Sequence, residues 1–231
     1  MTSFLSHAKI NLGLQVLNKR EDDYHNIQSC FVEIDLEDTL DFSQSSSFQL
    51  SVEDADIPID ESNLISKAYR FIRFRAENVK TEFSIHLKKC IPIGGGLGGG
   101  SSNAAVTLNA LNKLWNLNLS SEELEAMGRE IGADVPFFIK GGIRLVEGIG
   151  DILSSVDPTP MKNLHFILVV PPIHIPTHWA YRALNKTLQP NKSQPKFPPL
   201  SKPMKWELFD NDFERVIHET YPEIGQIKAS L

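Results

Sequence analysis

Six of the seven residues from Gly94 to Gly100 are glycines, and Leu97 alone interrupts them. Glycine loses more backbone entropy on folding than any other residue, so a loop this rich in glycine needs a reason. Without Cβ atoms, backbone N–H groups can approach phosphate oxygens, and a helix that begins after the loop adds the positive end of its dipole. The run therefore favours a phosphate-binding loop over the alternatives of a flexible turn or a tight strand-to-helix packing site.

The residues after the glycines narrow the kind of phosphate loop. A Walker-type loop ends in Gly-Lys-Ser or Gly-Lys-Thr, and here Gly100 is followed by a serine. The run also contains the GxGxxG pattern of dinucleotide-binding folds, which requires an acidic residue near position 120 at the end of a strand. The acids in that region, Glu122 and Glu123, belong to a helix-capping box instead. An NAD-dependent oxidoreductase is therefore the weaker alternative.

Alternation of apolar and polar residues predicts the strands that position this loop, and apolar residues at helical spacing predict the helices. The predicted strands span His7–Leu17, Asn26–Leu36, Phe48–Val52, Phe83–Leu87, Ile143–Glu147 and Leu164–Val170. The predicted helices span Asn63–Phe74, Ala104–Trp115, a segment from the Ser120–Glu123 capping box to Gly132, a short stretch opened by Ala133–Pro136, and Asp212–Leu231. The proline-rich segment Lys186–Glu207 predicts a loop. This arrangement indicates an α+β fold.

Composition excludes several classes of protein. The 231 residues carry 23 basic and 29 acidic side chains, and the net charge of -6 argues against a general nucleic-acid binder. No apolar run reaches the roughly 18 residues of a membrane span, and the first seven residues do not resemble a secretory signal. The two cysteines, Cys30 and Cys90, do not form a CxxC pair or a metal-binding pattern. We therefore expect a cytoplasmic protein that binds neither membranes nor nucleic acids.

Five ordered motifs, spread over nearly the whole chain, resemble the GHMP kinases. They are Ala8-Lys9-Ile10-Asn11-Leu12, Asp23-Tyr24-His25, the segment from Pro92 through the glycines to Ala105, Ile131-Gly132-Ala133-Asp134-Val135-Pro136, and Ile175-Pro176-Thr177. The resemblance implies a fold of two α+β domains, with the active site in the interdomain cleft. On this basis we expect an N-terminal domain over residues 1–148 and a C-terminal domain over residues 149–231.

The resemblance also implies a reaction. The branch of the family with the most similar motifs uses ATP to phosphorylate the 2-hydroxyl of 4-diphosphocytidyl-2-C-methyl-D-erythritol, a step in the non-mevalonate route to isoprenoid precursors. We therefore expect ATP as co-substrate and a small molecule as acceptor. Mg²⁺ is expected to arrive with ATP and to be held mainly by phosphate oxygens and water, with Ser102 as the candidate protein contact.

Lys9 and Asp134 are the catalytic pair that the resemblance implies. A tertiary alcohol is a poor nucleophile, and a carboxylate helps by orienting it and accepting its proton. A nearby lysine can keep that carboxylate ionised and offset charge on the phosphoryl group. The alternatives are a helix N-cap for Asp134 and a solvated strand face for Lys9.

The remaining site residues follow from the same resemblance. The implied ATP-binding residues are Pro92, Ile93, Gly94, Gly95, Gly96, Leu97, Gly98, Gly99, Gly100, Ser101, Ser102 and Asn103, with Lys89 and Asn63 as candidates for the adenosine pocket. The implied cytidine-binding residues are Tyr24, His25 and Tyr181, and Asn11 and Thr177 are candidates for the substrate hydroxyls or phosphates. The alternative for Tyr24 and Tyr181 is an ordinary core or surface position.

The family pattern includes a third, C-terminal glycine-rich motif followed by a closing strand. The chain reaches Leu231 without such a motif. From this difference we expect lower stability and lower activity than in a version with that motif. A nucleotide-binding remnant without full catalytic activity is accordingly the second alternative function.

Overall fold

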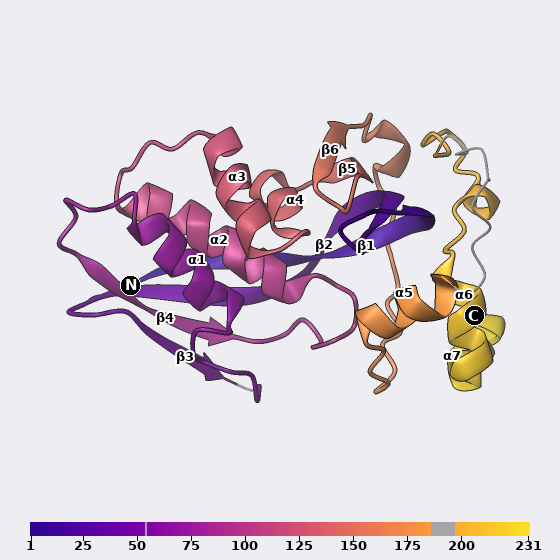
Figure 1. Cartoon of the computed structure of the whole chain (residues 1–231), viewed down its shortest axis with the longest axis horizontal. Coiled ribbons are helices and arrows are strands. Elements are labelled where there is room, and N and C mark those ends of the chain that lie inside the picture. Colours follow the sequence, from indigo (N-terminus) through magenta and orange to yellow (C-terminus); the bar gives the residue numbers. More distant parts are fainter. Residues whose placement is uncertain (54, 186–196) are drawn as a thin grey trace. The chain divides into compact units, whose positions relative to one another are not determined.

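The computed structural model describes residues 1–53, 55–185 and 197–231, and it mixes strands and helices as predicted for an α+β fold (Figure 1). The chain forms two compact units that interleave along the sequence. The first unit comprises residues 1–10 and 33–142, and the second comprises residues 11–32 and 143–231. The family resemblance predicted two domains that are each continuous in sequence, with a boundary between residues 148 and 149. That division stays a prediction.

Two long strands supply segments to both units. Strand β1 spans Thr2–Lys19 and strand β2 spans His25–Ser45, so both are longer than the segments that alternation predicted. The two strands pair with each other. Because the first unit ends at residue 10 within β1, Lys9 belongs to the first unit and Asn11 belongs to the second.

The sheet of the first unit is built around β4 (Glu82–Lys88). This strand pairs antiparallel with residues 39–45 of β2 and parallel with β3 (Gln49–Glu53). Its apolar side chains at positions 83, 85 and 87 are buried, as the alternation predicted. Four helices cover one face of this sheet in Figure 1: α1 (Leu64–Arg73), α2 (Gly99–Leu114), α3 (Ser121–Ile131) and α4 (Val135–Lys140).

Local signals explain where these helices begin and end. The predicted capping box is present at the start of α3, where the Ser120 hydroxyl accepts from the Glu123 N–H and the Glu123 carboxylate accepts from the Ser120 N–H. Gly132 ends α3, also as predicted. Helix α2 begins at Gly99, earlier than its apolar pattern indicated, and Gly98 directly before it adopts a left-handed φ of 72°.

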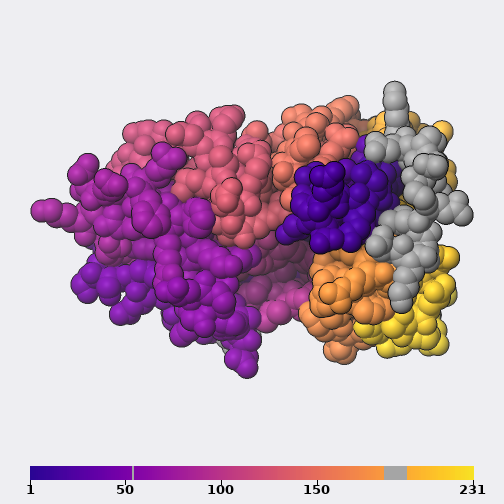
Figure 2. All heavy atoms as spheres, in the orientation of Figure 1, coloured from indigo at the N-terminus to yellow at the C-terminus, as the bar shows by residue number. Residues whose placement is uncertain are grey.

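In its described residues, the second unit combines a short sheet with three α-helices. Strand β5 (Ile143–Glu147) pairs antiparallel with residues 29–32 of β2 and with β6 (Ile152–Ser155). The helices are α5 (Thr177–Asn185), α6 (Phe213–Thr220) and α7 (Pro222–Ser230), and the 3-10 helices are η1 (Thr159–Met161) and η2 (Trp206–Leu208). Helix α5 contacts α6, and the orange atoms around α5 lie beside yellow atoms of the C-terminal helices in Figure 2. Leu14, Val16 and Ile27 pack with Leu184 of α5 and Val216 of α6.

Two predictions for the second unit are wrong. Residues 164–170 form no strand in the described structure, and Ile167 there is 92% exposed. An apolar run favours a strand, but a strand also needs a neighbour to accept its backbone hydrogen bonds. The predicted helix Asp212–Leu231 is divided into α6 and α7 at Tyr221, because Pro222 lacks an N–H and disfavours helical backbone in the residue before it.

The predicted loop Lys186–Glu207 is described only in part. Residues 186–196 lie outside the described residues, and residues 197–205 are irregular, as predicted. The last two residues of the predicted loop belong to η2 instead.

Candidate active site

The glycine loop lies between β4 and α2 and takes a conformation that only glycine adopts easily. Gly94, Gly96 and Gly98 have φ values of 73°, 71° and 72°. The first N–H groups of any helix have no intrahelical partner, and at α2 the N-cap residue Gly98 has no side chain that could accept from them. This end of the helix is therefore suited to bind an anionic group such as a phosphate.

Two glycines of the loop are also required by close packing. A Cβ at Gly98 would lie 2.7 Å from the Phe138 ring and 3.2 Å from Lys9 Cγ. A Cβ at Gly99 would lie 3.0 Å from Ile91 Cγ2 and 3.1 Å from the Lys89 ammonium nitrogen. The loop thus packs tightly against Lys9 at Gly98 and against Lys89 at Gly99.

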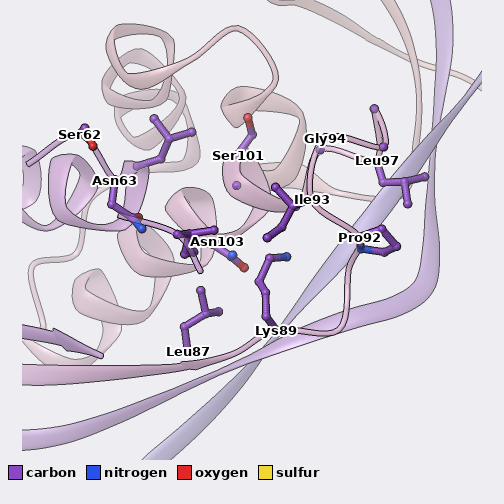
Figure 3. Close-up of a pocket in the computed structure, with 17 residues that line it drawn as sticks. Ser62, Asn63, Leu87, Lys89, Pro92, Ile93, Gly94, Leu97, Ser101 and Asn103 are labelled. Atoms are coloured by element: carbon purple, nitrogen blue, oxygen red, sulfur yellow. The ribbon is translucent and has the colours of Figure 1, made fainter. Parts of the chain in front are cut away.

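A cavity of about 380 Å³ opens beside the loop (Figure 3). It is lined by Ile57, Ser62, Asn63, Leu64, Leu87, Lys89, Pro92 to Gly100, Ser101 and Asn103. Asn103 extends from α2 and Lys89 follows β4, and both reach the middle of the lining in Figure 3. All of these residues belong to the first unit, and they include the predicted ATP-binding residues with the exception of Ser102.

The polar side chains that line the cavity differ in how many hydrogen bonds they make within the protein. The Asn63 carboxamide caps α1 by accepting from the Ile65 N–H at 2.9 Å, and it donates to the Pro58 carbonyl at 2.7 Å. The Lys89 ammonium donates to Asp38 at 2.6 Å and to the Ile91 carbonyl at 2.8 Å. These contacts hold both side chains in the lining, and their adenosine-binding roles stay predictions.

Asn103 offers an acceptor toward the cavity. Its side chain is 2% exposed, and its Oδ1 atom has no hydrogen-bond partner within the described part of the chain. A buried, unpaired carboxamide oxygen is unfavourable, so a donor group of a bound ligand would stabilise it.

Lys9 and Asp134 form an ion pair beside the loop. The distance from Lys9 Nζ to Asp134 Oδ2 is 3.5 Å, with Lys9 buried and the Asp134 side chain 29% exposed. The Lys9 N–H also donates to the Leu97 carbonyl at 2.9 Å, which ties β1 to the loop. Asp134 occupies the N-cap position of α4 but makes no side-chain capping bond. The geometry therefore disagrees with a capping role for Asp134 and with a solvated position for Lys9.

The two serines at the start of α2 face different surroundings. Ser101 lines the cavity. Ser102 is 1% exposed, and its hydroxyl accepts a hydrogen bond of 2.8 Å from the Ser6 hydroxyl. The Ser102 oxygen keeps a second lone pair, and a neutral oxygen is a ligand that Mg²⁺ accepts. The described residues contain no cluster of three His, Cys, Asp or Glu side chains that could hold a metal ion.

The predicted cytidine-binding residues all belong to the second unit. The rings of His25 and Tyr181 stack with their centroids 5.2 Å apart and their planes at 20°. His25 is 8% exposed, and its Nε2 atom has no hydrogen-bond partner among the described residues. Tyr24 beside it is 58% exposed, and Thr177 begins α5. The structure thus brings His25 and Tyr181 together and leaves the Tyr24 ring accessible.

Comparison with known proteins decides the family. The family described as "GHMP kinases N terminal domain" matches residues 63–142 of this chain. A protein of Chlorobium limicola named 4-diphosphocytidyl-2-C-methyl-D-erythritol kinase is 38% identical, covering 99% of this chain and 81% of the relative. A protein of Prosthecochloris aestuarii with the same name is 39% identical over the same shares of both chains. This chain belongs to the 4-diphosphocytidyl-2-C-methyl-D-erythritol kinase family.

Solved structures agree with this family. A crystal structure of 4-(cytidine 5'-diphospho)-2C-methyl-D-erythritol kinase matches with a TM-score of 0.73 and 30% identity, covering 99% of this chain and 81% of that chain. The Methanococcus jannaschii mevalonate kinase matches with a TM-score of 0.52 and 16% identity over 68% of this chain and 56% of that chain, and this likeness concerns the fold alone. The predicted GHMP kinase fold and small-molecule kinase class are confirmed, with ATP as the co-substrate of such kinases.

Two buried polar residues near the kinase loop were not predicted. Asp38 holds Lys89, and Ser6 holds Ser102. A signal for Asp38 exists in the sequence, because the alternation of Ile34, Leu36 and Leu40 places it on an apolar face. A carboxylate on such a face is buried and must therefore be paired.

Proposed function

We propose that this chain transfers the γ-phosphate of ATP to the 2-hydroxyl of 4-diphosphocytidyl-2-C-methyl-D-erythritol. The observation that carries the proposal is the Lys9–Asp134 pair beside an uncapped helix N-terminus, in a chain whose relatives bear the name of this kinase over nearly its whole length. A carboxylate and a lysine next to an anion-binding loop are the groups that phosphoryl transfer to an alcohol requires.

In this mechanism the loop and the pair have separate tasks. The N–H groups at the start of α2 bind phosphate oxygens, and the tight packing of Gly98 and Gly99 keeps these groups in place before ATP binds. Asp134 orients the acceptor hydroxyl and takes its proton as the new P–O bond forms, while the bond from the γ-phosphorus to the β,γ-bridging oxygen breaks and ADP leaves. Lys9 stabilises the carboxylate of Asp134 and offsets negative charge on the phosphoryl group. Positioning contributes most, because phosphoryl transfer passes through a loose transition state.

Mg²⁺ is part of the proposal. It would be held by phosphate oxygens and water and, on the protein side, by the second lone pair of the Ser102 oxygen. When bound, the ion would neutralise part of the negative charge of the ATP phosphates. The unpaired Oδ1 atom of Asn103 would accept a hydrogen bond from a donor group of the nucleotide.

The second unit would bind the cytidine part of the acceptor. Tyr24 and Tyr181 supply aromatic faces for the pyrimidine, and base stacking of this kind contributes about 1–3 kcal/mol in other nucleotide sites. The unpaired Nε2 atom of His25 suits a polar edge of the base. Asn11 and Thr177 would contact hydroxyl or phosphate groups of the same substrate.

The compartment of the protein belongs to the same proposal. Both cysteines are unpaired, and burial raises the pKa of the Cys30 thiol to about 11. Two free thiols suit a reducing cytoplasm, which we propose as the location. Within the described ranges, no helix has the length and apolar character needed to cross a membrane.

An acceptor panel tests the proposed function. The chain is incubated with ATP and Mg²⁺ and with 4-diphosphocytidyl-2-C-methyl-D-erythritol, mevalonate or homoserine, and ADP release and the phosphorylated product are measured. We expect turnover with the cytidine-linked acceptor and little with the other two. ATP binding without turnover on any acceptor, or preference for mevalonate or homoserine, would contradict the proposal. Tight NADH binding without ATP binding would indicate an oxidoreductase.

A further inference from the structure

Strand β1 contacts the glycine loop and α2 at two points. The backbone N–H of Lys9 donates to the carbonyl of Leu97 at 2.9 Å. Three residues earlier in β1, the Ser6 hydroxyl donates to the Ser102 hydroxyl at 2.8 Å. One strand therefore supplies the lysine of the Lys9–Asp134 pair and also two bonds to the segment that would bind phosphate.

The Ser6–Ser102 bond is completely buried. Ser6 is 0% exposed and Ser102 is 1% exposed. A hydroxyl removed from water is unfavourable unless it is hydrogen-bonded, and an alanine at either position would avoid the problem with almost the same volume. The two hydroxyls are hydrogen-bonded to each other although 96 residues separate them in the sequence. The fold therefore places them as a buried pair.

The position of Ser102 explains what its bond can do. The three residues before it in the chain include Gly99 and Gly100, which have no side chains to anchor the first turn of α2. The Ser102 N–H makes the first intrahelical bond, to the Gly98 carbonyl at 2.9 Å. A side chain fixed at this point limits the many conformations open to consecutive glycines.

We propose that Ser6 is a positioning residue for the nucleotide site. It acts through Ser102 to hold the first turn of α2 in register with Lys9, so that the N–H groups of the turn are ordered before a phosphate binds. This inference rests on the proposed function, because it assumes that the loop binds the phosphates of ATP. It concerns ATP affinity, which can be measured without the acceptor.

A double-mutant cycle tests the inference. Ser6→Ala, Ser102→Ala and the double variant are titrated with ATP in a calorimeter without acceptor. We expect Ser6→Ala to weaken ATP affinity about fivefold, because ATP binding must then impose the order that one neutral hydrogen bond supplied beforehand. We expect Ser102→Ala to weaken it at least as much, and the double variant to match Ser102→Ala within about twofold, because Ser6 acts only through Ser102. The KM of the acceptor should stay unchanged in Ser6→Ala.

Ser29→Ala is the matched control. Ser29 is also 0% exposed and donates one hydrogen bond, to the Gly13 carbonyl at 2.6 Å, but it belongs to the second unit. We expect a drop in Tm similar to that of Ser6→Ala with unchanged ATP affinity. The inference is overturned if Ser6→Ala behaves like this control, or if the effects of Ser6→Ala and Ser102→Ala simply add.

A second variant covers the case in which Ser6→Ala does not fold. Ser6→Cys keeps a weaker donor of similar shape, and we expect its ATP affinity to lie between those of the unchanged protein and Ser102→Ala. Unchanged affinity in Ser6→Cys together with unchanged affinity in Ser102→Ala would overturn the inference. If the cycle gives the expected coupling while no acceptor is phosphorylated, the proposed function fails and the positioning role stands.

Discussion

Two lysine–aspartate pairs border the glycine loop, and they differ in how much of each pair is already used within the protein. In the pair of Lys89 and Asp38, the aspartate is 0% exposed and its carboxylate also accepts from the N–H groups of Cys90 and Ile91 at 2.8 Å each. Nζ and Oδ2 are 2.6 Å apart, and the ammonium donates to the Ile91 carbonyl as well. We call this the closed pair.

The pair of Lys9 and Asp134 is open by comparison. Its atoms are 3.5 Å apart, and the aspartate is 29% exposed and caps no helix. A carboxylate that remains partly accessible can still bind another group, whereas one with several internal partners cannot do so without losing them. From this difference we expect the closed pair to stabilise the chain before the loop, and we propose that the open pair takes part in the chemistry.

The largest expected effect comes from breaking the closed pair. Asp38→Ala leaves the buried ammonium of Lys89 without its partner and two backbone N–H groups without an acceptor. Removing one partner of a buried ion pair lowers the free energy of unfolding by about 3–5 kcal/mol, which lowers Tm by roughly 10 °C in a chain of this size. Thermal and urea unfolding measure this.

An exposed pair supplies the control for that variant. Glu61→Ala removes the partner of Arg70, and both side chains are at least half exposed. The unfolding transition should change little, because solvent screens such pairs. A normal Tm for Asp38→Ala would show that the closed pair does not stabilise the protein, and the contrast between the pairs would fail.

Breaking the open pair should affect turnover instead of stability. Asp134→Asn keeps the shape of the side chain but cannot accept a proton, and Lys9→Ala removes the cation. Each should lower turnover on the order of 10²-fold or more. For Asp134→Asn we expect Tm to stay within a few degrees, measured alongside the ADP-release assay. Near-normal turnover in folded Asp134→Asn protein would remove this carboxylate from the mechanism.

Crowding the loop against the open pair should have a smaller effect. Gly98→Ala places a residue with a side chain at a φ of 72°, which costs about 1–2 kcal/mol, and pushes its Cβ against Phe138 and Lys9. We expect ATP affinity to fall roughly tenfold in a calorimetric titration, with a lower Tm.

Gly96→Ala separates backbone strain from crowding. Gly96 has a φ of 71°, but a Cβ there would meet nothing within 4 Å. We expect this variant to lose a smaller part of its ATP affinity than Gly98→Ala. Equal losses in the two variants would mean that contact with Lys9 and Phe138 contributes nothing.

The parts of this arrangement that depend on local pattern could be predicted from the sequence. Period-two alternation predicted β4 and β5, and the capping box predicted the start of α3. The glycine run predicted a loop that leads into a helix. These signals are contained within about ten residues, so neighbouring side chains decide them. The pairing of Lys9 with Asp134 could be anticipated only from the family resemblance, because 125 positions separate them in the chain.

The remaining features depend on partners distant in the sequence. Helix α5 was not predicted, although Trp179, Ala180, Ala183 and Leu184 follow a helical spacing. Strand β6 was not predicted because its four residues are too few to establish an alternation. Residues 164–170 carry a strand-like pattern and form no strand in the described structure. The bonds of Ser6 and Asp38 are decided by which side chains the fold brings opposite them. A polar residue on an apolar face indicates that a hydrogen-bond or ion-pair partner must exist, but the local sequence does not identify that partner.

The smallest expected effect concerns the residue that leads into the open pair. Gly132 lies two positions before Asp134 and has a φ of -178°, an extended backbone that any residue adopts. A Cβ there would make ordinary contacts, 3.5 Å from Val135 Cγ2 and 3.9 Å from the Ser101 hydroxyl oxygen. Gly132→Ala should therefore raise the free energy of unfolding by about 0.4–1 kcal/mol, because it restricts the unfolded chain, and raise Tm by roughly 1–3 °C. Turnover should stay within about twofold, since Asp134 keeps its position. A large loss of turnover with a preserved Tm would mean that Asp134 must move during the reaction, and that the open pair depends on a flexible residue at 132 as well as on its accessibility.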